Sequence, residues 1–367
     1  MKVLIIGGHF SPAISIIENL RNNDIFYVGR RFAIEGDTAV SLEFKEIDKI
    51  GIPFFNINTA RLQRKFTKYT IPSFVKFPKG LVESVSILRK VKPDVVLGFG
   101  GYVQVPIIIA ARIFNIPIVI HEQTFDAGLS NRMLARFATK ICISWESSRI
   151  YFPKQKTILT GLPIKKELIN LKKEKKEKTK LPVIYITGGS LGSHTINQLV
   201  LKSLKNLLKT FYIIHQTGDS QVYRDYDELV NIKNDLPEKI INNYRVEKFL
   251  SANDALLAIK EAEIVVARAG VNTVLELLYL EKPSFLIPIS FSQKNEQEKN
   301  ALFLKNSGLA EIGNENKLNS EAFTNKINDI YLNISKYVVN DRKEFKFENA
   351  AGKIVRVLED VCKKKKT

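Results

Sequence analysis

Cysteine and histidine are scarce in this chain of 367 residues. It contains two cysteines, Cys142 and Cys362, and four histidines that lie far apart. So few cysteines exclude a disulfide framework and indicate a reducing compartment. Because the histidines lack the spacing of zinc ligands, the sequence predicts no metal site.

Long hydrophobic runs are also absent. The most apolar stretch, residues 103–120, is interrupted by Arg112, Asn115 and Pro117. This pattern is typical of a helix followed by a strand, and it excludes a membrane span there. The chain starts with a short apolar strand that runs into two glycines, which is not the pattern of a signal peptide.

Acidic residues are outnumbered by basic ones, 38 to 56, so the formal net charge is +18. Such an excess favours a polyanionic partner. Between Arg61 and Lys90 there are eight basic residues and one acidic residue, with aromatic and apolar side chains interleaved. This mixture suits an anionic membrane surface, and it would also suit single-stranded nucleic acid. Because no nucleic-acid-binding motif accompanies it, we expect a membrane surface and no nucleic acid as the partner.

Short apolar runs alternate with helical patterns along the chain. The first series of predicted strands comprises residues 3–6, 25–28, 95–97, 118–120, 140–143 and 157–159, and the second comprises 183–186, 211–214, 245–248, 264–266 and 285–287. Continuous β-branched strands separated by helices are typical of parallel sheets buried on both faces. The sequence therefore predicts an α/β protein with two doubly wound domains.

The boundary between these domains is marked by a run rich in lysine and glutamate at residues 172–180, which cannot contribute to a core. We expect a first domain at residues 1–164 and a second at 165–340. Residues 341–367 have a helix-like apolar periodicity. We expect this tail to form a helix that crosses back to the first domain.

In the first half, glycine-rich turns follow two predicted strands. Gly7 and Gly8 precede His9, and Gly98-Phe99-Gly100-Gly101-Tyr102 forms the second turn. His9 would act either as the base that takes a proton from an attacking hydroxyl or as a structural residue that bonds the loop backbone. The dinucleotide pattern GxGxxG is absent here, which argues against an NAD enzyme.

A third polar cluster follows the strand at residues 118–120. It reads His121-Glu122-Gln123-Thr124, and Asn131 comes shortly afterwards. Such a cluster at a strand end commonly lines a ligand site. Glu122 has two possible roles, one in catalysis and one in holding a backbone amide.

The second half carries the pattern expected of a nucleotide-sugar site. Gly188-Gly189-Ser190-Leu191-Gly192 predicts an anion cradle at a helix start, and it lacks the Gly-Lys-Ser/Thr ending of an ATP-binding loop. Further along, Thr273 and Glu276 open a helix after a strand and a glycine, so that helix amides face an anion and a carboxylate can take ribose hydroxyls. Glu296 and Gln297 follow the next strand and suit sugar hydroxyls.

Taken in order, these motifs resemble those of the MurG family of N-acetylglucosaminyltransferases, in glycosyltransferase family 28. The shared patterns are Gly-Phe-Gly-Gly-Tyr-Val, His-Glu-Gln, Gly-Gly-Ser-x-Gly, His-Gln-Thr-Gly, Arg-x-Gly-x-x-Thr-x-x-Glu and Gln-x-x-Asn-Ala. The resemblance implies a GT-B fold, which has two Rossmann-like domains and a cleft between them. It also implies inverting transfer of N-acetylglucosamine from UDP-GlcNAc to undecaprenyl-pyrophosphoryl-MurNAc-pentapeptide, without a metal or other cofactor. The reaction would take place at the cytoplasmic face of the cell membrane, with the enzyme bound peripherally.

Carried over position by position, the resemblance assigns roles to individual residues. For donor binding it implies Lys165, Gly189, Ser190, Gly192, Leu250, Arg268, Thr273, Glu276, Glu296 and Gln297. For acceptor binding it implies Gly7, Gly8, Gly100, Gly101, Tyr102, Thr124 and Asn131, and for catalysis His9 and Glu122. In this assignment Leu250 touches the uracil through its backbone, Glu276 holds the ribose, and the segment near Arg61–Lys79 docks on the membrane.

The chain departs from the family pattern at several positions. The first loop, Gly-Gly-Thr-Gly-Gly-His in the family, is shortened to Gly7-Gly8-His9, and Thr124 and Lys165 replace an asparagine and an arginine. These changes affect mainly the acceptor. They leave open another glycolipid glycosyltransferase, such as one acting on diacylglycerol, and a membrane scaffold that binds UDP without catalysis. A UDP-GlcNAc epimerase shares the fold, but it has no need of a basic, aromatic surface.

Overall fold

The computed structural model describes residues 1–8, 10–20, 22–32, 40–59, 70–173, 179–189, 191–290, 295–340 and 349–366. The chain forms two compact units. Unit 1 comprises Met1–Lys166 together with Phe345–Thr367, and unit 2 comprises Glu167–Glu344. These divisions lie close to the boundaries expected at residues 164 and 340, and they place the C-terminal segment with the first unit.

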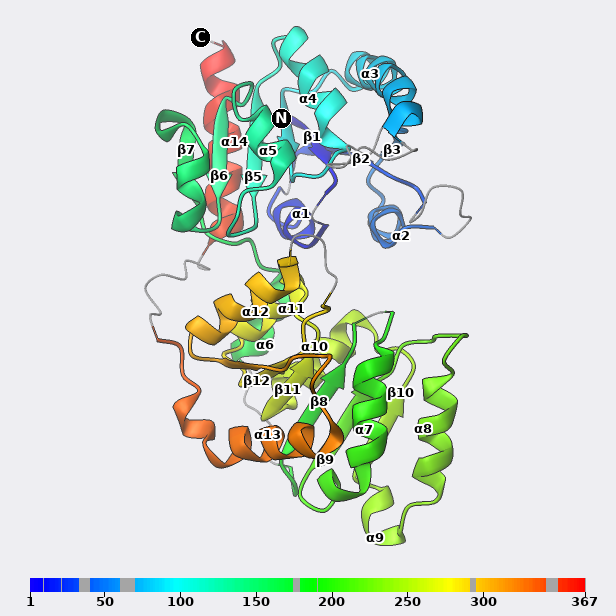
Figure 1. Ribbon diagram of the computed structural model, residues 1–367. Helices are drawn as coiled ribbons and strands as arrows, with labels where there is room; N and C mark the ends of the chain where they lie inside the picture. Colours follow the sequence, from blue (N-terminus) through cyan, green and yellow to red (C-terminus); the bar gives the residue numbers. More distant parts are fainter. Residues whose placement is uncertain are drawn as a thin grey trace. The chain divides into compact units, whose positions relative to one another are not determined.

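Unit 1 is built on a seven-stranded parallel sheet with the order β3-β2-β1-β4-β5-β6-β7 (Figure 1). Its strands are β1 (Lys2–Ile6), β2 (Asp24–Gly29), β3 (Phe54–Asn56), β4 (Val95–Gly98), β5 (Ile118–Glu122), β6 (Lys140–Ile143) and β7 (Thr157–Leu159). All but β3 overlap the predicted strands. The edge strand β3 was missed because it has three residues, Phe-Phe-Asn, and none of them is fully buried.

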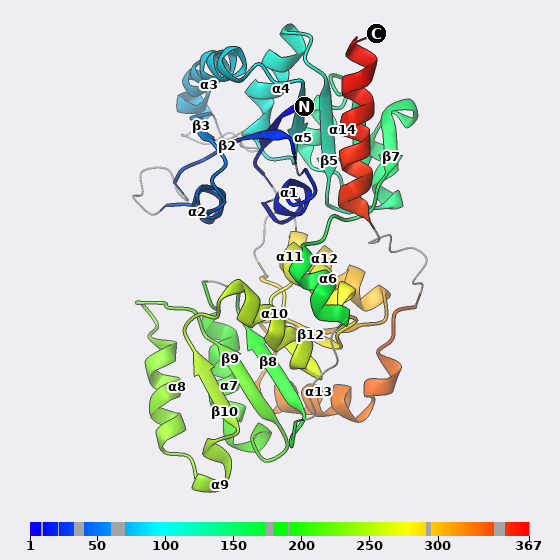
Figure 2. The ribbon, with the colours of Figure 1, turned by 180° about the vertical axis from the view of Figure 1, so that it is seen from behind.

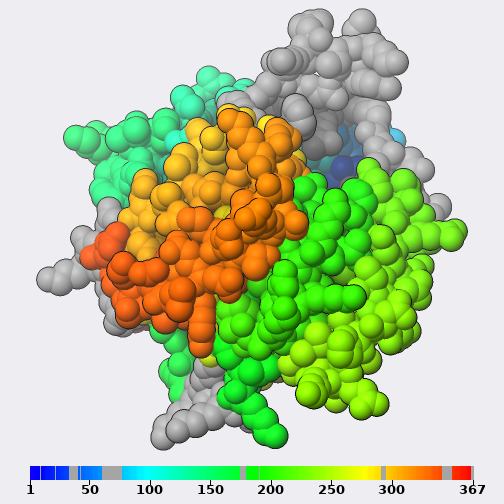
Figure 3. Space-filling model, turned by 60° about the horizontal axis from the view of Figure 1, so that its bottom comes forward, coloured from blue at the N-terminus to red at the C-terminus, as the bar shows by residue number. Residues whose placement is uncertain are grey.

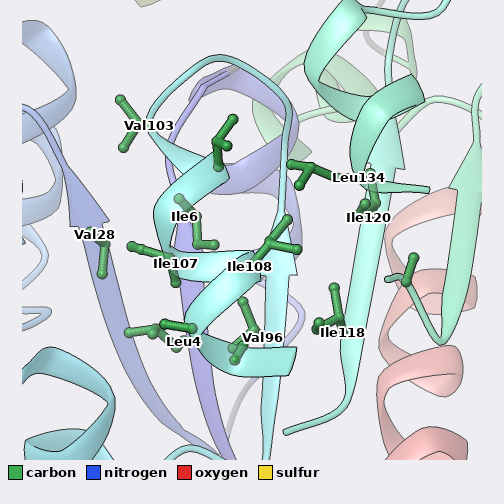
Figure 4. Close-up of a cluster of buried hydrophobic side chains, with 14 of the residues drawn as sticks. Leu4, Ile6, Val28, Val96, Val103, Ile107, Ile108, Ile118, Ile120 and Leu134 are labelled. Atoms are coloured by element: carbon green, nitrogen blue, oxygen red, sulfur yellow. The ribbon is translucent and has the colours of Figure 1, made fainter. Parts of the chain in front are cut away.

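Helices cover both faces of this sheet. They are α1 (Phe10–Ile17), α2 (Leu42–Lys49), α3 (Thr70–Val91), α4 (Gln104–Ile113), α5 (Leu129–Leu134) and α14 (Ala350–Lys366), with short 3₁₀ turns η1 (Glu146–Tyr151) and η2 (Lys154–Lys156). Leu4 and Ile6 of β1 point to the face that α3, α4 and α5 cover (Figure 4). Val3 and Ile5 point to the opposite face, as the two-residue period of a strand requires.

The C-terminal helix α14 completes the second of these faces. Figure 2 shows it beside α1, and Ile354 and Leu358 are fully buried in the cluster that contains Val3 and Ile5 of β1. The last helix of the chain therefore belongs to the core formed by the first strand.

Unit 2 has a six-stranded parallel sheet with the order β10-β9-β8-β11-β12-β13. Its strands are β8 (Val183–Thr187), β9 (Tyr212–Gln216), β10 (Tyr244–Glu247), β11 (Ile264–Ala267), β12 (Ser284–Leu286) and β13 (Ala310–Ile312). Strands β10 and β12 begin and end one residue before the predicted ranges. The edge strand β13 was not predicted, because it is three residues long and includes Glu311.

The helices of unit 2 are α6 (Lys166–Lys173), which starts at the boundary between the units, α7 (His194–Leu207), α8 (Asp225–Asn234), α9 (Glu238–Ile241), α10 (Ala252–Glu261), α11 (Val271–Tyr279), α12 (Glu296–Asn306) and α13 (Ser320–Leu332), followed by the 3₁₀ turn η4 (Ile334–Lys336). Helices α7, α8 and α13 bury their apolar sides in one core cluster. Figure 3 shows the orange region that contains α13 against the green region that contains α7. Between these helices, Ser203 Oγ donates a hydrogen bond to the carbonyl of Ser320 at 3.1 Å.

In both sheets the order in which strands are added changes direction at the first strand of the unit. In unit 1, β1 lies between β2 and β4, and in unit 2, β8 lies between β9 and β11. Ligands of doubly wound sheets bind outside the carboxyl ends of the strands at such a switch point. The loops after these strands are therefore where functional residues are expected to gather. In the described part of the chain, no helix combines the length and apolar character needed to cross a bilayer.

Candidate active site

The glycine-rich loop between β8 and α7 has the backbone of an anion cradle. Gly189 and Gly192 have φ angles of +86° and +76°. A Cβ on Gly192 would lie 2.0 Å from the carbonyl oxygen of Thr217, whereas one on Gly189 would meet nothing within 4 Å. Gly192 is thus required by close packing, and Gly189 leaves open space in front of the loop. Ser190 lies outside the described residues.

Buried hydrogen bonds fix α7 against the end of β9. The side-chain nitrogen of Asn197 donates to the carbonyl of Thr217 at 3.1 Å and to Asp225 Oδ2 at 2.9 Å. Its oxygen lies 3.1 Å from His215 Nε2, and His215 Nδ1 lies 2.9 Å from the hydroxyl of Tyr244. Burial lowers the pKa of His215 to about 3, so the ring is neutral at physiological pH. The neutral ring donates from Nε2 and accepts at Nδ1, and this network holds the loops after β8 and β9 together.

The start of α11 brings a hydroxyl and a carboxylate to the same edge of the sheet. Gly270 precedes the helix, Thr273 lies in its first turn, and both Thr273 and Glu276 are partly buried. Burial, together with the negative charge of Glu276, raises the pKa of Tyr185 in β8 to about 12. The charge of Glu276 therefore acts on Tyr185 of the central strand β8, and its contact with the ribose stays a prediction.

Arg268 is held by groups of the protein itself. Its guanidinium donates to the carbonyls of Ile287 at 3.0 Å and Pro288 at 3.3 Å and forms an ion pair with Glu315. Burial opposes ionisation of Glu315, but hydrogen bonds from Arg268 and Thr195 outweigh it and hold the pKa of Glu315 below its ordinary value. Arg268 thus joins the loop after β12 to the start of α7, which is a structural role beside the expected donor-binding one.

Gln297 and Glu296 open α12 after the strand β12. Gln297 Oε1 accepts a hydrogen bond from the backbone N–H of Ile289 at 3.1 Å, and Glu296 is exposed. One turn further, the buried Asn300 donates to the carbonyl of Ala269 at 3.1 Å. These bonds tie α12 to the loops that follow β11 and β12, so Gln297 lies at the same edge as Thr273.

The remaining donor candidates lie at different places in the fold. Leu250 follows β10 and is partly buried. Lys165 belongs to unit 1, while the other donor candidates belong to unit 2. The structure therefore brings Gly189, Gly192 and the α11 residues to one sheet edge without Lys165.

In unit 1, two glycine turns meet beside the switch point. A Cβ on Gly8 would lie 2.3 Å from the carbonyl oxygen of Gly100, and Gly100 and Gly101 have φ angles of +85° and +75°. Only glycine fits these positions. Tyr102 follows directly and accepts a hydrogen bond from Arg30 Nη1. His9 lies outside the described residues.

Glu122 is buried, and both of its carboxylate oxygens accept hydrogen bonds from its own loop. It accepts from the backbone N–H and hydroxyl of Thr124 at 2.9 and 2.6 Å, from Gly128 N at 2.9 Å and from Asn131 Nδ2 at 2.9 Å. Asn131 also accepts from Gln104 Nε2 at 2.6 Å. Of the two roles expected for Glu122, this geometry corresponds to the structural one, with Thr124 and Asn131 as its partners. Among the described residues, no group of three or more His, Cys, Asp or Glu side chains is placed to hold a metal ion.

Two Rossmann-like units with parallel sheets define the class of GT-B proteins, and the expected fold is confirmed. The model of the glycosyltransferase family 28 N-terminal domain matches residues 6–143, and that of the family 28 C-terminal domain matches residues 183–354. The chain belongs to glycosyltransferase family 28.

Curated relatives match over nearly the full length. A protein of Clostridium botulinum (strain Langeland / NCTC 10281 / Type F) is 33% identical over 377 residues, covering 99% of each chain. One from strain Alaska E43 / Type E3 is 35% identical over 373 residues, covering 97% of each. Both are named UDP-N-acetylglucosamine--N-acetylmuramyl-(pentapeptide) pyrophosphoryl-undecaprenol N-acetylglucosamine transferase.

Solved structures share the fold. MurG of Acinetobacter baumannii has a TM-score of 0.71 and 24% identity, covering 98% of this chain and 99% of that one. The UDP-GlcNAc 2-epimerase of Neisseria meningitidis, bound to UDP-GlcNAc, has a TM-score of 0.67 and 15% identity, covering 98% and 100%. The chain is thus a glycosyltransferase, as its motifs predicted.

Proposed function

We propose that this chain transfers N-acetylglucosamine from UDP-GlcNAc to undecaprenyl-pyrophosphoryl-MurNAc-pentapeptide. The observation that carries this conclusion is the match over 99% of the chain to a relative named for that reaction. This chain has one glycine-rich strand end on each unit, at Gly8 and Gly100 in unit 1 and at Gly189 and Gly192 in unit 2.

The donor is assigned to unit 2. The amides at the start of α7, with Gly189 and Ser190, face the diphosphate, because a helix N-terminus carries a partial positive charge. Glu276 takes the ribose hydroxyls, Gln297 with Glu296 takes those of the sugar, and Leu250 contacts the uracil. The support for this assignment is that Gly189, Thr273 and Glu276 follow β8 and β11, which are neighbouring strands.

The reaction is a single displacement. The acceptor hydroxyl forms a bond to the anomeric carbon while the bond from that carbon to the phosphate oxygen breaks and UDP leaves. His9 takes the hydroxyl proton, and the amides of the glycine-rich loop stabilise the charge on the departing diphosphate, so no metal is needed. Glu122 is not used as the base, because both of its oxygens already accept hydrogen bonds from its loop.

The acceptor is a lipid, and the enzyme docks on the cytoplasmic face of the membrane. The net charge of +18 and the basic, aromatic segment near Arg61–Lys79 support this part of the proposal. Residues 61–69 of that segment lie outside the described residues, and α3 begins at Thr70.

The test is transfer of radiolabelled N-acetylglucosamine from UDP-GlcNAc to a synthetic undecaprenyl-pyrophosphoryl-MurNAc-pentapeptide analogue in detergent, with a chelator present. Diacylglycerol serves as the parallel acceptor. We expect product only on the diphosphate-linked acceptor. Product only on diacylglycerol would establish the other glycolipid synthase, and UDP binding without any product would establish a scaffold.

A further inference from the structure

The ends of three neighbouring strands of unit 1 form a row. In the sheet register, Val28 of β2 lies opposite Ile6 of β1, and Ile6 lies opposite Gly98 of β4. Two residues further along each chain come Arg30, Gly8 and Gly100. The row therefore places the positively charged side chain of Arg30 beside two glycine turns at the switch point of the sheet.

The glycine turns in this row leave backbone without side chains facing solvent. Gly8 and Gly101 are exposed, and a Cβ on Gly101 would lie 3.5 Å from the Cα of Gly8. Directly after Gly101 and Tyr102, α4 begins at Gln104, so the positive end of its dipole faces the same loop. The surface suits a ligand that carries negative charge and approaches the backbone closely.

Arg30 reaches across this surface. Its Nη1 donates to the hydroxyl of Tyr102, and its guanidinium carbon lies 5.9 Å from the centre of the Tyr102 ring. Arg30 follows β2 and Tyr102 follows β4, while β1 lies between these strands. The bond therefore spans the end of β1, where Gly7 and Gly8 are.

The carboxylate of Glu43 contacts the backbone of Arg30. Its carboxylate accepts hydrogen bonds from the hydroxyl of Tyr27 and from the backbone N–H of Arg30. A Cβ on Gly7 would lie 1.8 Å from Glu43 Oε1, so the carboxylate fills the space beneath the first glycine turn. Burial raises the pKa of Glu43, whereas the hydrogen bonds and the charge of Arg30 lower it, and the first effect is larger. Glu43 therefore fixes the backbone that carries Arg30.

The guanidinium has donors to spare for a ligand. Arginine carries five N–H groups, and within the described part of the chain the Arg30 side chain makes one hydrogen bond, to the hydroxyl of Tyr102. Guanidinium groups bind phosphate oxygens through two parallel N–H donors, which lysine cannot do.

We propose that Arg30 binds the diphosphate of the lipid acceptor, with Tyr102 and the Gly8 and Gly101 backbone completing the site, and that Glu43 is a positioning residue for Arg30. The inference rests on the proposed function in one respect, namely that the acceptor carries a diphosphate.

The test compares Arg30→Gln with Arg31→Gln. Arg31 is a matched control, because it is the next residue, is exposed and stacks over Phe44 instead of facing Tyr102. Two readouts are measured in detergent: the KM values for acceptor and donor, and the direct binding of undecaprenyl diphosphate against undecaprenyl monophosphate. In Arg30→Gln we expect the acceptor KM and the Kd of the diphosphate lipid to rise about 10- to 100-fold, with the donor KM unchanged. Arg31→Gln should behave as the wild type.

Arg30→Lys should recover part of the loss, because it restores the charge without the paired donors. Glu43→Gln should reduce the preference for diphosphate over monophosphate lipid, a ratio that a general loss of folded protein would leave unchanged. A wild type that binds undecaprenyl diphosphate but transfers no sugar would refute the proposed function and leave the binding test of Arg30 intact. Equal losses in Arg30→Gln and Arg31→Gln, or equal losses for the two lipids, would overturn the inference.

Discussion

The two units repeat one topology but stabilise their switch points with different chemistry. In unit 2, the amide of Asn197 and the neutral ring of His215 join the loops after β8 and β9. In unit 1, the charged side chain of Arg30 spans from the end of β2 to the loop after β4. The comparison teaches that the same fold offers an anion backbone dipoles on unit 2 and, as we propose, a guanidinium on unit 1.

The largest effect is expected from His9, the proposed base of unit 1. In His9→Ala, kcat should fall about 10²- to 10⁴-fold, because the acceptor hydroxyl loses its base. UDP binding, measured by calorimetry, should stay at the wild-type value, since the donor is assigned to unit 2. Wild-type kcat in this variant would contradict the role of His9 as the base and leave it the structural role.

The next largest effect is expected from a variant that breaks the buried hydrogen-bond network of Asn197 and His215 in unit 2. Asn197→Ala should lower the free energy of unfolding by about 2–4 kcal/mol, because it leaves buried polar groups of His215 and Asp225 without a partner. Urea unfolding measures this change. Asn206→Ala, at an exposed position near the end of the same helix, is the matched control and should change stability by less than about 0.5 kcal/mol. Equal losses in the two variants would contradict the role given to the network.

The pH dependence of stability sharpens the same comparison. The pKa of His215 is about 3 in the folded chain and about 6.5 when unfolded, so below pH 6.5 the unfolded state binds the extra proton. Stability is therefore full above pH 6.5 and is lost as the pH falls, by about 2 kcal/mol between pH 7 and pH 5. Urea unfolding at the two pH values should show this loss in the wild type and a smaller one in His215→Gln. An unchanged pH slope in the variant would assign the loss to other groups.

The smallest expected effect concerns the ribose contact. Glu276→Gln should raise the KM for UDP-GlcNAc about tenfold and leave the acceptor KM unchanged, because a charged hydrogen bond becomes a neutral one. Glu321→Gln, an exposed carboxylate in the first turn of α13, provides the control. If Glu276→Gln changed the acceptor KM instead, the division of donor and acceptor between the units would be wrong.

The sequence predicted the interior of each sheet better than its edges. Runs such as Val3–Ile6 and Val183–Ile186 are mostly β-branched and are buried along their whole length, so their apolar pattern predicts a strand without knowledge of the packing. Strands β3 and β13 were missed, because each has three residues and one of them is Asn56 or Glu311, whereas the equally short edge strand β7 reads Thr-Ile-Leu and was predicted.

The candidate site was predictable only where a motif marks it. The glycine turns were found from their spacing, but Glu122 could not be assigned to one of its two roles until its four donors were placed. Arg30 and Asn197 carry no sequence signal, because their partners come from strands that are distant in the chain and adjacent in the sheet. His9 and Ser190 lie outside the described residues, so their roles stay predictions.

The return of α14 to unit 1 has a consequence for synthesis on the ribosome. The face of the first sheet that contains Val3 and Ile5 is sealed by Ile354, Leu358 and Val361. All the residues of unit 2 are translated before that helix emerges. Until then α1 and α2 cover only part of this apolar face, and unit 2, which is continuous in sequence, is able to fold first.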